Sequence, residues 1–317
     1  MTFSSTDPSE IVASLVELLD LAQDAPYGEF STPATVAAYR GESSPQPGGH
    51  VFGGQVMGQA LMAVGRTVAE DRRIHSMYSY FLAPGDPAHP IRFQVDALRD
   101  GGSFSVRRVL ANQPADDADG GERTILAMTA SFQKEQDGLE HSERAPEAPD
   151  PEGLPTTAEA LAGIDHPTAR YWATQRPIDI RHVTDPIYLR PDPASAGAGG
   201  APRGDTQMVW MRTLAPVGTE PLLHDAILAF ASDYTPFEPI LRRQGLSWMT
   251  PGLKLATINH AIWWHKHVRA DEWLLYVQRS PSASGGRGLT HGQVFDRAGD
   301  LVATVTQEGM IRTPSSD

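Results

Sequence analysis

The sequence predicts an α+β protein in which one unit, a helix followed by an antiparallel sheet, occurs twice in a chain of 317 residues. Two observations predict this. Each half of the chain contains a helical segment followed by several runs of β-forming residues, in the same order. Matching positions in the two halves lie at similar offsets: His75 and His260 are 185 residues apart, and Gly102 and Gly286 are 184 apart. The shared order of elements indicates a duplication.

In the first half, apolar residues at helical spacing predict a helix over 9–24. The segment 48–71 opens with glycines and then has a helical pattern, in which Gly54, Gly58 and Ala60 would let a neighbour pack closely. The segment 29–43 can hold a strand. An antiparallel meander follows, with predicted strands at 74–82, 91–99 continuing into 103–112, and 124–133.

The second half begins after a Pro-rich, acidic stretch over 134–170, which has the composition of a linker. A Gly-rich loop is predicted at 190–205, and the helix expected over 220–245 should break near Pro236. The remaining strands are predicted at 206–216, 254–265, 272–280, 287–297 and 301–312. The expected organisation is an N-terminal domain at 1–135, a connecting segment at 136–205 and a C-terminal domain at 206–317.

Composition excludes several classes of protein. Hydrophobic residues make up 40% and charged residues 21% of the chain, which is typical of a globular protein. The net charge of −13 and the lack of a basic run argue against nucleic acid or an anionic membrane as partner. With no cysteine there is no thiolate nucleophile, and the expected location is cytoplasmic because no signal peptide or membrane span is apparent. His265 and His267 lack a third ligand at useful spacing, so we expect neither a metal nor a cofactor.

A helix cradled by a long antiparallel sheet is the hotdog arrangement, and two in one chain make a double hotdog. The expected architecture is therefore two long sheets, each wrapped around a helix, fused in one chain. Eight segments, in order, carry a resemblance to the acyl-CoA thioesterase II family. They are "VFGGQVMGQAL" (51–61), "IHSMYSYFLAPGD" (74–86), "LRDGGSFSVRRV" (98–109), "MTASFQ" (128–133), "FASDYTPFEPIL" (230–241), "ATINHAIWWH" (256–265), "EWLLYVQRSPSASGGRG" (272–288) and "ATVTQEGMIR" (303–312).

The resemblance implies hydrolysis of acyl-CoA to free acid and CoA, with three catalytic residues in the C-terminal domain. By their motifs these are Asp233, Thr257 and Gln307. Taken alone, each has an ordinary structural explanation: an Asp near a helix end is usually a cap, Thr favours strands, and a Gln near a strand end is usually solvated. The chain departs from the family at Asn259, where an Asp is usual, so a negative charge near Thr257 is missing.

These residue types suit direct attack by water on a thioester. Asp233 can accept a proton from water, and Thr257 and Gln307 can hold that water in place. The sequence contains no G-x-S-x-G elbow, so a covalent serine route has no support. We expect a backbone N–H at a helix N-terminus or a glycine turn to stabilise the oxyanion, without assigning it to a residue.

The first copy has Arg72 and Ser131 at the positions we match to Thr257 and Gln307, which predicts one active site per chain. His75 and His260 occupy equivalent places in this alignment and are interpreted as structural. Arg107 and Arg108, or Arg287, are candidates for binding CoA phosphates, and a solvated surface is an equally good explanation for them.

Four functions stay open at this point. The first is a thioesterase for medium to long fatty acyl-CoA, and the second acts on acyl groups bound to a carrier protein. The third is an acyl-CoA-binding or regulatory hotdog protein with weak or no hydrolase activity. The fourth, a hotdog dehydratase, needs a His and a helix carboxylate that we do not find. The fused chain is expected to form a homo-oligomer, a dimer or tetramer of the fused unit.

Overall fold

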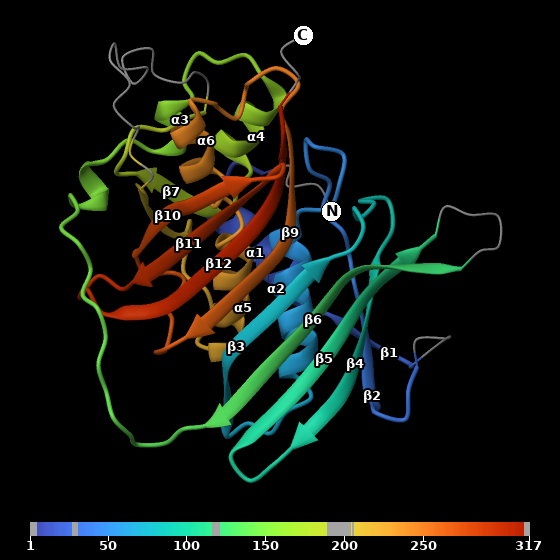
Figure 1. The fold of residues 1–317 in the computed structure, drawn as a ribbon. Coiled ribbons are helices and arrows are strands. Elements are labelled where there is room, and N and C mark those ends of the chain that lie inside the picture. The colour runs from blue at the N-terminus through green and yellow to red at the C-terminus, as the bar shows by residue number, and fades with distance from the viewer. Residues whose placement is uncertain (1–4, 27–30, 116–120, 189–203, 205, 314–317) are drawn as a thin grey trace.

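The structure is a computed structural model that describes residues 5–26, 31–115, 121–188, 204 and 206–313. A single twelve-stranded sheet, antiparallel throughout, curves around a layer of helices (Figure 1). Across the sheet the strands are β1 (Ala22–Asp24), β2 (Thr35–Gly41), β4 (Ile91–Asp100), β5 (Phe104–Pro114), β6 (Glu122–Lys134), β3 (Arg72–Phe81), β9 (Lys254–Trp264), β12 (Leu301–Arg312), β11 (Arg287–Phe295), β10 (Leu274–Ser284), β8 (Thr206–Thr213) and β7 (Ile178–His182).

The two halves meet at the pairing of β3 with β9, where Ser79 lies opposite His260. This pairing joins what the sequence predicted as two sheets into one continuous sheet. The predicted α+β class and double hotdog architecture are confirmed, and the backbone groups at the junction are satisfied between the two copies rather than left as open edges.

Helices α2 (Gly53–Gly65) and α5 (Pro221–Ala231) are the two that the sheet encloses (Figure 1). They pack closely because their contact carries small residues: a Cβ at Gly58 would lie 3.1 Å from the carbonyl oxygen of Ala226. The other helical segments are α1 (Pro8–Leu19), η1 (Pro151–Gly153), α3 (Thr157–Ala160), α4 (Pro167–Thr174) and α6 (Glu238–Gln244).

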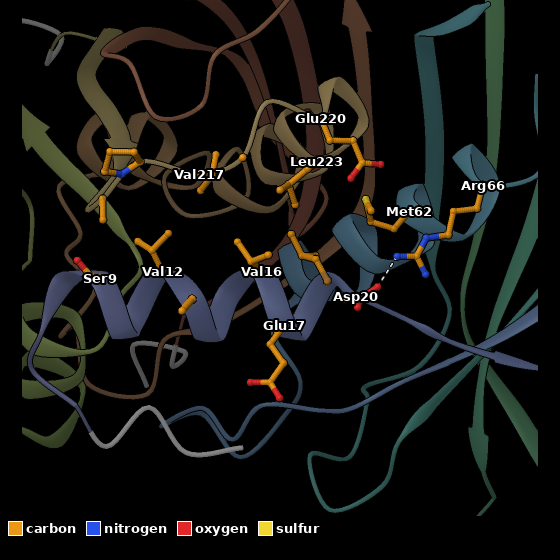
Figure 2. A pocket seen from close by; sticks show the side chains of 15 residues that line it. Ser9, Val12, Val16, Glu17, Asp20, Met62, Arg66, Val217, Glu220 and Leu223 are labelled. Atoms are coloured by element: carbon orange, nitrogen blue, oxygen red, sulfur yellow. Dashed lines mark hydrogen bonds and ion pairs between the residues drawn. The ribbon is translucent and has the colours of Figure 1, made fainter. Parts of the chain in front are cut away.

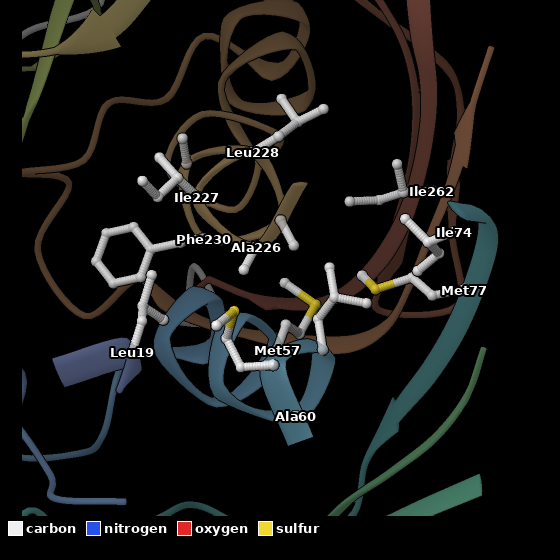
Figure 3. Close-up of a cluster of buried hydrophobic side chains, with 14 of the residues drawn as sticks. Leu19, Met57, Ala60, Ile74, Met77, Ala226, Ile227, Leu228, Phe230 and Ile262 are labelled. Carbon is white, nitrogen blue, oxygen red and sulfur yellow. The ribbon is translucent and has the colours of Figure 1, made fainter. Parts of the chain in front are cut away.

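The core lies between these two helices and the inner face of the sheet. Figure 3 shows Met57 and Ala60 of α2 facing Ala226 and Phe230 of α5, with Ile262 of β9 on the sheet side. All five side chains are buried. Because both helices are buried on nearly every side, their sequences are apolar around most of the circumference instead of along one stripe.

Several predicted boundaries need correction. The first helix ends at Leu19, because the next residue, Asp20, has extended backbone angles, and the end of the predicted helix becomes strand β1. The connecting segment contributes β7 to the edge of the sheet, which its weak pattern did not predict. The predicted helix break is confirmed: α5 ends before Pro236 and α6 begins after it. The loop expected at 190–205 lies almost entirely outside the described residues, and the division into 1–135, 136–205 and 206–317 stays a prediction.

Candidate active site

The three residues singled out in the C-terminal half lie within hydrogen-bonding distance of one another. Asp233 follows the end of α5, Thr257 lies in β9 and Gln307 lies in β12. The Thr257 hydroxyl donates to Asp233 Oδ1 over 3.2 Å, and Gln307 Nε2 donates to Thr257 Oγ1 over 3.2 Å. The structure thus brings the three groups into one cluster, while their catalytic role stays a prediction.

A β-bulge in β9 makes this arrangement possible. The pairing of β9 with β12 shifts register between Thr257 and Asn259, so that Ile258 is an additional residue in β9. In a regular strand, residues three positions apart point to opposite faces. The additional residue turns Thr257 to the same inner face as His260, which is fully buried next to Gln307.

The N-terminus of α2 completes the cluster, although α2 belongs to the other copy of the duplicated unit. A backbone N–H of Gly54 hydrogen-bonds the carboxylate of Asp233. A Cβ at Gly53 would lie only 2.6 Å from Asp233 Oδ2, so a side chain there would displace the carboxylate. The positive end of the helix dipole also favours a negative charge at this place.

The pKa of Asp233 is raised from its ordinary value of 3.8 to about 7, and burial is the largest cause. Hydrogen bonds from Thr257, Gly54 and Gln307 act in the opposite direction, because they stabilise the ionised carboxylate. A carboxylate with a pKa near neutrality can take a proton from water and later return it.

Asp233 and Thr257 line a cavity of about 1180 Å³. Its apolar wall includes Phe81, Phe237 and Trp248. Exposed cationic side chains also line it, and these are Lys254, Arg287 and Arg312. The cavity therefore offers an apolar interior together with a basic rim, in a chain whose net charge is −13.

Arg176 is a cation in the wall of this cavity that the sequence reasoning missed. The guanidinium is buried and lies over the rings of Tyr234 at 4.5 Å and Trp172 at 5.2 Å. Its Nε has no hydrogen-bond partner among the described residues. Contact with two aromatic faces stabilises this guanidinium, which has no carboxylate partner among the residues that the structure describes.

Of the three arginines that the sequence offered as ligands for CoA phosphates, only one lines the cavity. Arg107 is buried and bonded to Asp100 over 2.9 Å, and Arg108 forms an ion pair with Asp96; neither lines the cavity, so both are wrong as phosphate ligands at this site. Arg287 does line it, with its Nε 3.0 Å from a carboxylate oxygen of Glu308.

Asn259 donates to the carboxylate of Glu308 and is not among the cavity-lining residues, so the missing charge there does not face Thr257. No group of three His, Cys, Asp or Glu suited to a metal occurs in the part of the chain that the structure describes. Among those residues there is also no helix long and apolar enough to cross a bilayer.

A second hollow of about 680 Å³ lies between α1 and the segment that leads into α5 (Figure 2). Val12, Val16 and Leu223 line it, and an ion pair between Arg66 and Asp20 lies at its rim. It contains no cluster comparable to that around Asp233.

The first copy has a bulge in the corresponding strand. The pairing of β3 with β6 shifts register between Ile74 and Ser76, so that His75 is the additional residue. The match of Arg72 and Ser131 to Thr257 and Gln307 is therefore wrong by one or two residues, as is the match of the two histidines. Aligning the two bulges gives three pairs: Ile74 with Thr257, Met77 with His260, and Ala130 with Gln307.

Comparison with known proteins agrees with this architecture. The model described as acyl-CoA thioesterase N-terminal domain matches residues 42–133, and that described as acyl-CoA thioesterase C-terminal domain matches residues 140–311. Acyl-CoA thioesterase 2 of Haemophilus influenzae is 35% identical over 280 residues, which are 86% of this chain and 92% of that protein. Human acyl-coenzyme A thioesterase 8 is 35% identical over 289 residues, covering 86% of this chain and 84% of that one.

A solved structure extends the likeness to three dimensions. The acyl-CoA thioesterase II TesB2 from Mycobacterium marinum is 36% identical and superposes with a TM-score of 0.71, covering 96% of this chain and all of that one. Both family models, the sequence identity and the shared fold lead to one conclusion: this chain belongs to the acyl-CoA thioesterase II family and is an acyl-CoA thioesterase.

Proposed function

We propose that the protein hydrolyses medium to long fatty acyl-CoA by direct attack of a water molecule held by Asp233, Thr257 and Gln307. The observation that carries this proposal is the hydrogen-bonded cluster of the three side chains, two of which, Asp233 and Thr257, line the large cavity. The burial that raises the pKa of Asp233 to about 7 supports its role as general base.

In the proposed reaction, Asp233 takes a proton from the water as the water oxygen bonds to the thioester carbonyl carbon. The carbonyl oxygen becomes an oxyanion, which the N–H of Gly53 stabilises, because the first residue of a helix has no intrahelical acceptor for this group. The carbon–sulfur bond then breaks, and the protonated Asp233 returns its proton to the departing sulfur. The products are the free acid and CoA, and no covalent enzyme intermediate forms.

The shape and charge of the cavity support the assignment of the substrate. Apolar side chains such as Phe81, Phe237 and Trp248 suit a hydrocarbon chain. Lys254, Arg287 and Arg312 supply positive charge for the phosphates of CoA. The phosphates of a CoA ester would bind this basic rim. We therefore propose a CoA ester as the substrate, in preference to an ester of a carrier protein.

The test is release of free thiol from saturated acyl-CoA esters of increasing chain length, measured beside equilibrium binding of a non-hydrolysable thioether analogue. We expect turnover with a maximum at medium to long chains. Tight binding of the analogue without thiol release from any ester would contradict the proposal and favour an acyl-CoA-binding protein. A cytoplasmic location and a dimer or tetramer of the fused unit stay predictions.

A further inference from the structure

A chain of hydrogen bonds continues behind Gln307, away from the cavity. Gln307 Oε1 lies 2.6 Å from His260 Nδ1, and His260 Nε2 lies 2.9 Å from Ser232 Oγ. On its other side Gln307 bonds to Thr257, which bonds to Asp233. Ser232, His260 and Gln307 are almost completely buried, and neither Ser232 nor His260 lines the cavity.

The ionised carboxylate of Asp233 fixes the direction of every bond in this chain. A carboxylate only accepts, so Thr257 must give its single hydrogen to Asp233 and accept from the amide nitrogen of Gln307. The amide oxygen of Gln307 then faces His260 and also only accepts. The ring hydrogen of a neutral His260 must therefore be on Nδ1, and Nε2 accepts from Ser232.

The opposite direction is also available in the structure. Ser232 Oγ lies 3.0 Å from the carbonyl oxygen of Ala229, which is a second acceptor for its one hydrogen. If Ser232 donates there, His260 Nε2 must carry the hydrogen and Nδ1 must accept from the amide of Gln307. The amide oxygen then faces Thr257, which donates to Gln307 and no longer to Asp233. The position of one ring hydrogen on His260 thus decides which way the Gln307 amide points.

We propose that His260 and Ser232 are positioning residues for hydrolysis: His260, neutral and carrying its hydrogen on Nδ1, holds the Gln307 amide so that Thr257 donates to Asp233. This inference rests on the proposed roles of Asp233, Thr257 and Gln307. It assigns to Ser232 and His260 no contact with substrate, only control over the orientation of Gln307, which bonds to the cavity-lining Thr257.

Burial supports a neutral ring. It lowers the pKa of His260 to about 4, with the bond to Gln307 acting in the opposite direction. The neighbouring groups do not supply a charge: Ser79 Oγ donates to the His260 carbonyl oxygen, and Ser232 is uncharged. The titratable groups near Asp233 are Tyr234 and Tyr276, whose own pKa values are raised by burial.

The first experiment identifies the ring hydrogen by nitrogen NMR of the full chain labelled at histidine, at pH 8, where Asp233 is ionised. The His260 signals are assigned by their loss in the variant His260→Asn. We expect a neutral ring protonated on Nδ1. A ring protonated on Nε2, or on both nitrogens, would overturn the proposal. This readout needs no turnover, so it stays decisive even if the proposed function fails.

The second experiment compares two substitutions by steady-state kinetics. His260→Asn keeps an N–H close to the position of Nδ1 and should stay within about fivefold of the wild-type kcat, whereas His260→Leu removes the donor and should lower kcat by roughly 10- to 100-fold with little change in KM. His260→Leu should also move the acidic limb of the pH profile upward by roughly one unit, because Asp233 loses a hydrogen bond to its charged form.

The matched control is His75→Leu in the first copy, where the ring bonds to Ser131 over 2.8 Å outside the cavity. It should leave the pH profile unchanged. Equal kcat for His260→Asn and His260→Leu, or an unshifted acidic limb in His260→Leu, would overturn the proposal, because a purely structural histidine would affect both variants alike. A fully active Asp233→Asn variant would instead contradict the proposed function.

Discussion

The two copies of the hotdog unit share one backbone plan but differ at the positions that form the polar cluster of the second copy. Where the second copy has Thr257, His260 and Gln307, the bulge-aligned positions of the first copy are Ile74, Met77 and Ala130, all buried and apolar. The backbone plan is therefore present in both copies, whereas these three polar side chains are present in the second copy alone.

The helices show the same asymmetry. At the active end, Gly53 of α2 faces the carboxylate of Asp233. At the opposite end, Gly65 of α2 faces Leu222 of α5, whose side-chain carbons would clash with a Cβ added at that glycine. Asp233 follows the C-terminal end of α5, and its mirror is the C-terminal end of α2, where Gly65 faces an apolar side chain and no carboxylate. The active end nevertheless needs both copies, because the helix N-terminus at Asp233 belongs to the first.

The largest expected effect tests these two glycines against each other. Gly53→Ala places a methyl group 2.6 Å from Asp233 Oδ2 and should lower kcat/KM by about 100-fold, since a displacement of about 1 Å at a catalytic group can cost that much. Gly65→Ala meets only the flexible end of Leu222 and should alter thermal stability without altering kcat/KM. Similar losses of activity in both variants would contradict the asymmetry.

A somewhat smaller effect is expected at Thr257. Thr257→Val keeps the shape of the side chain but removes the hydrogen bond to Asp233, and it should lower kcat by roughly 10- to 100-fold. Because that bond lowers the pKa of Asp233, its loss should also shift the acidic limb of the pH profile upward. The reciprocal change Ile74→Thr should cost stability alone, and a gain of activity from it would show that the mirror end is not inert.

Removal of the Asp233 carboxylate should raise the stability of the fold while it lowers activity. The pKa of Asp233 is about 7 in the folded state and near 3.8 when unfolded, so its stabilising effect is complete below pH 3.8 and is lost as the pH rises through 7. Asp233→Asn should therefore be more stable than wild type at pH 8, by a few kcal/mol at most, and the gain should disappear near pH 4. Denaturant unfolding at both pH values measures it, and a pH-independent difference would contradict the raised pKa.

The smallest effect is expected at the rim. Arg287→Gln should raise KM for acyl-CoA a few-fold with unchanged kcat, because a half-exposed charge contributes little and is screened by salt. The matched control is Arg108→Gln, whose partner Asp96 lies away from the cavity. If both variants had the same KM at low and at high salt, Arg287 would not contribute to CoA binding.

The sequence was informative where a property is local. Apolar periodicity and turn residues located most helices and strands, and the motifs around Asp233, Thr257 and Gln307 identified three side chains that the fold brings together. Gly54 was also recognised as a place of close approach, and the approaching group is the backbone carbonyl of Phe230 in the helix of the other copy.

What the sequence could not supply depends on register and on contacts between distant segments. The alternation of side chains along a strand does not reveal a β-bulge, so the additional residues His75 and Ile258 could not be recognised. The alignment of the two copies from sequence is therefore in the wrong register. Arg107 is buried and pairs with the exposed Asp100 across a hairpin, and no spacing rule distinguishes such an arginine from a solvated one. Arg176 was missed because its partners are aromatic faces brought together only by folding.

The proposed role of Asp233 as general base is tested most directly by the dependence of kcat/KM on pH for wild type and Asp233→Asn, with thiol release as the signal. We expect the wild-type rate to rise through an ionisation near pH 7 and then level off, and Asp233→Asn to be at least about 100-fold slower and to lack this ionisation. A wild-type profile that is flat from pH 5 to 9, or an Asp233→Asn variant that turns over as fast as wild type, would contradict it.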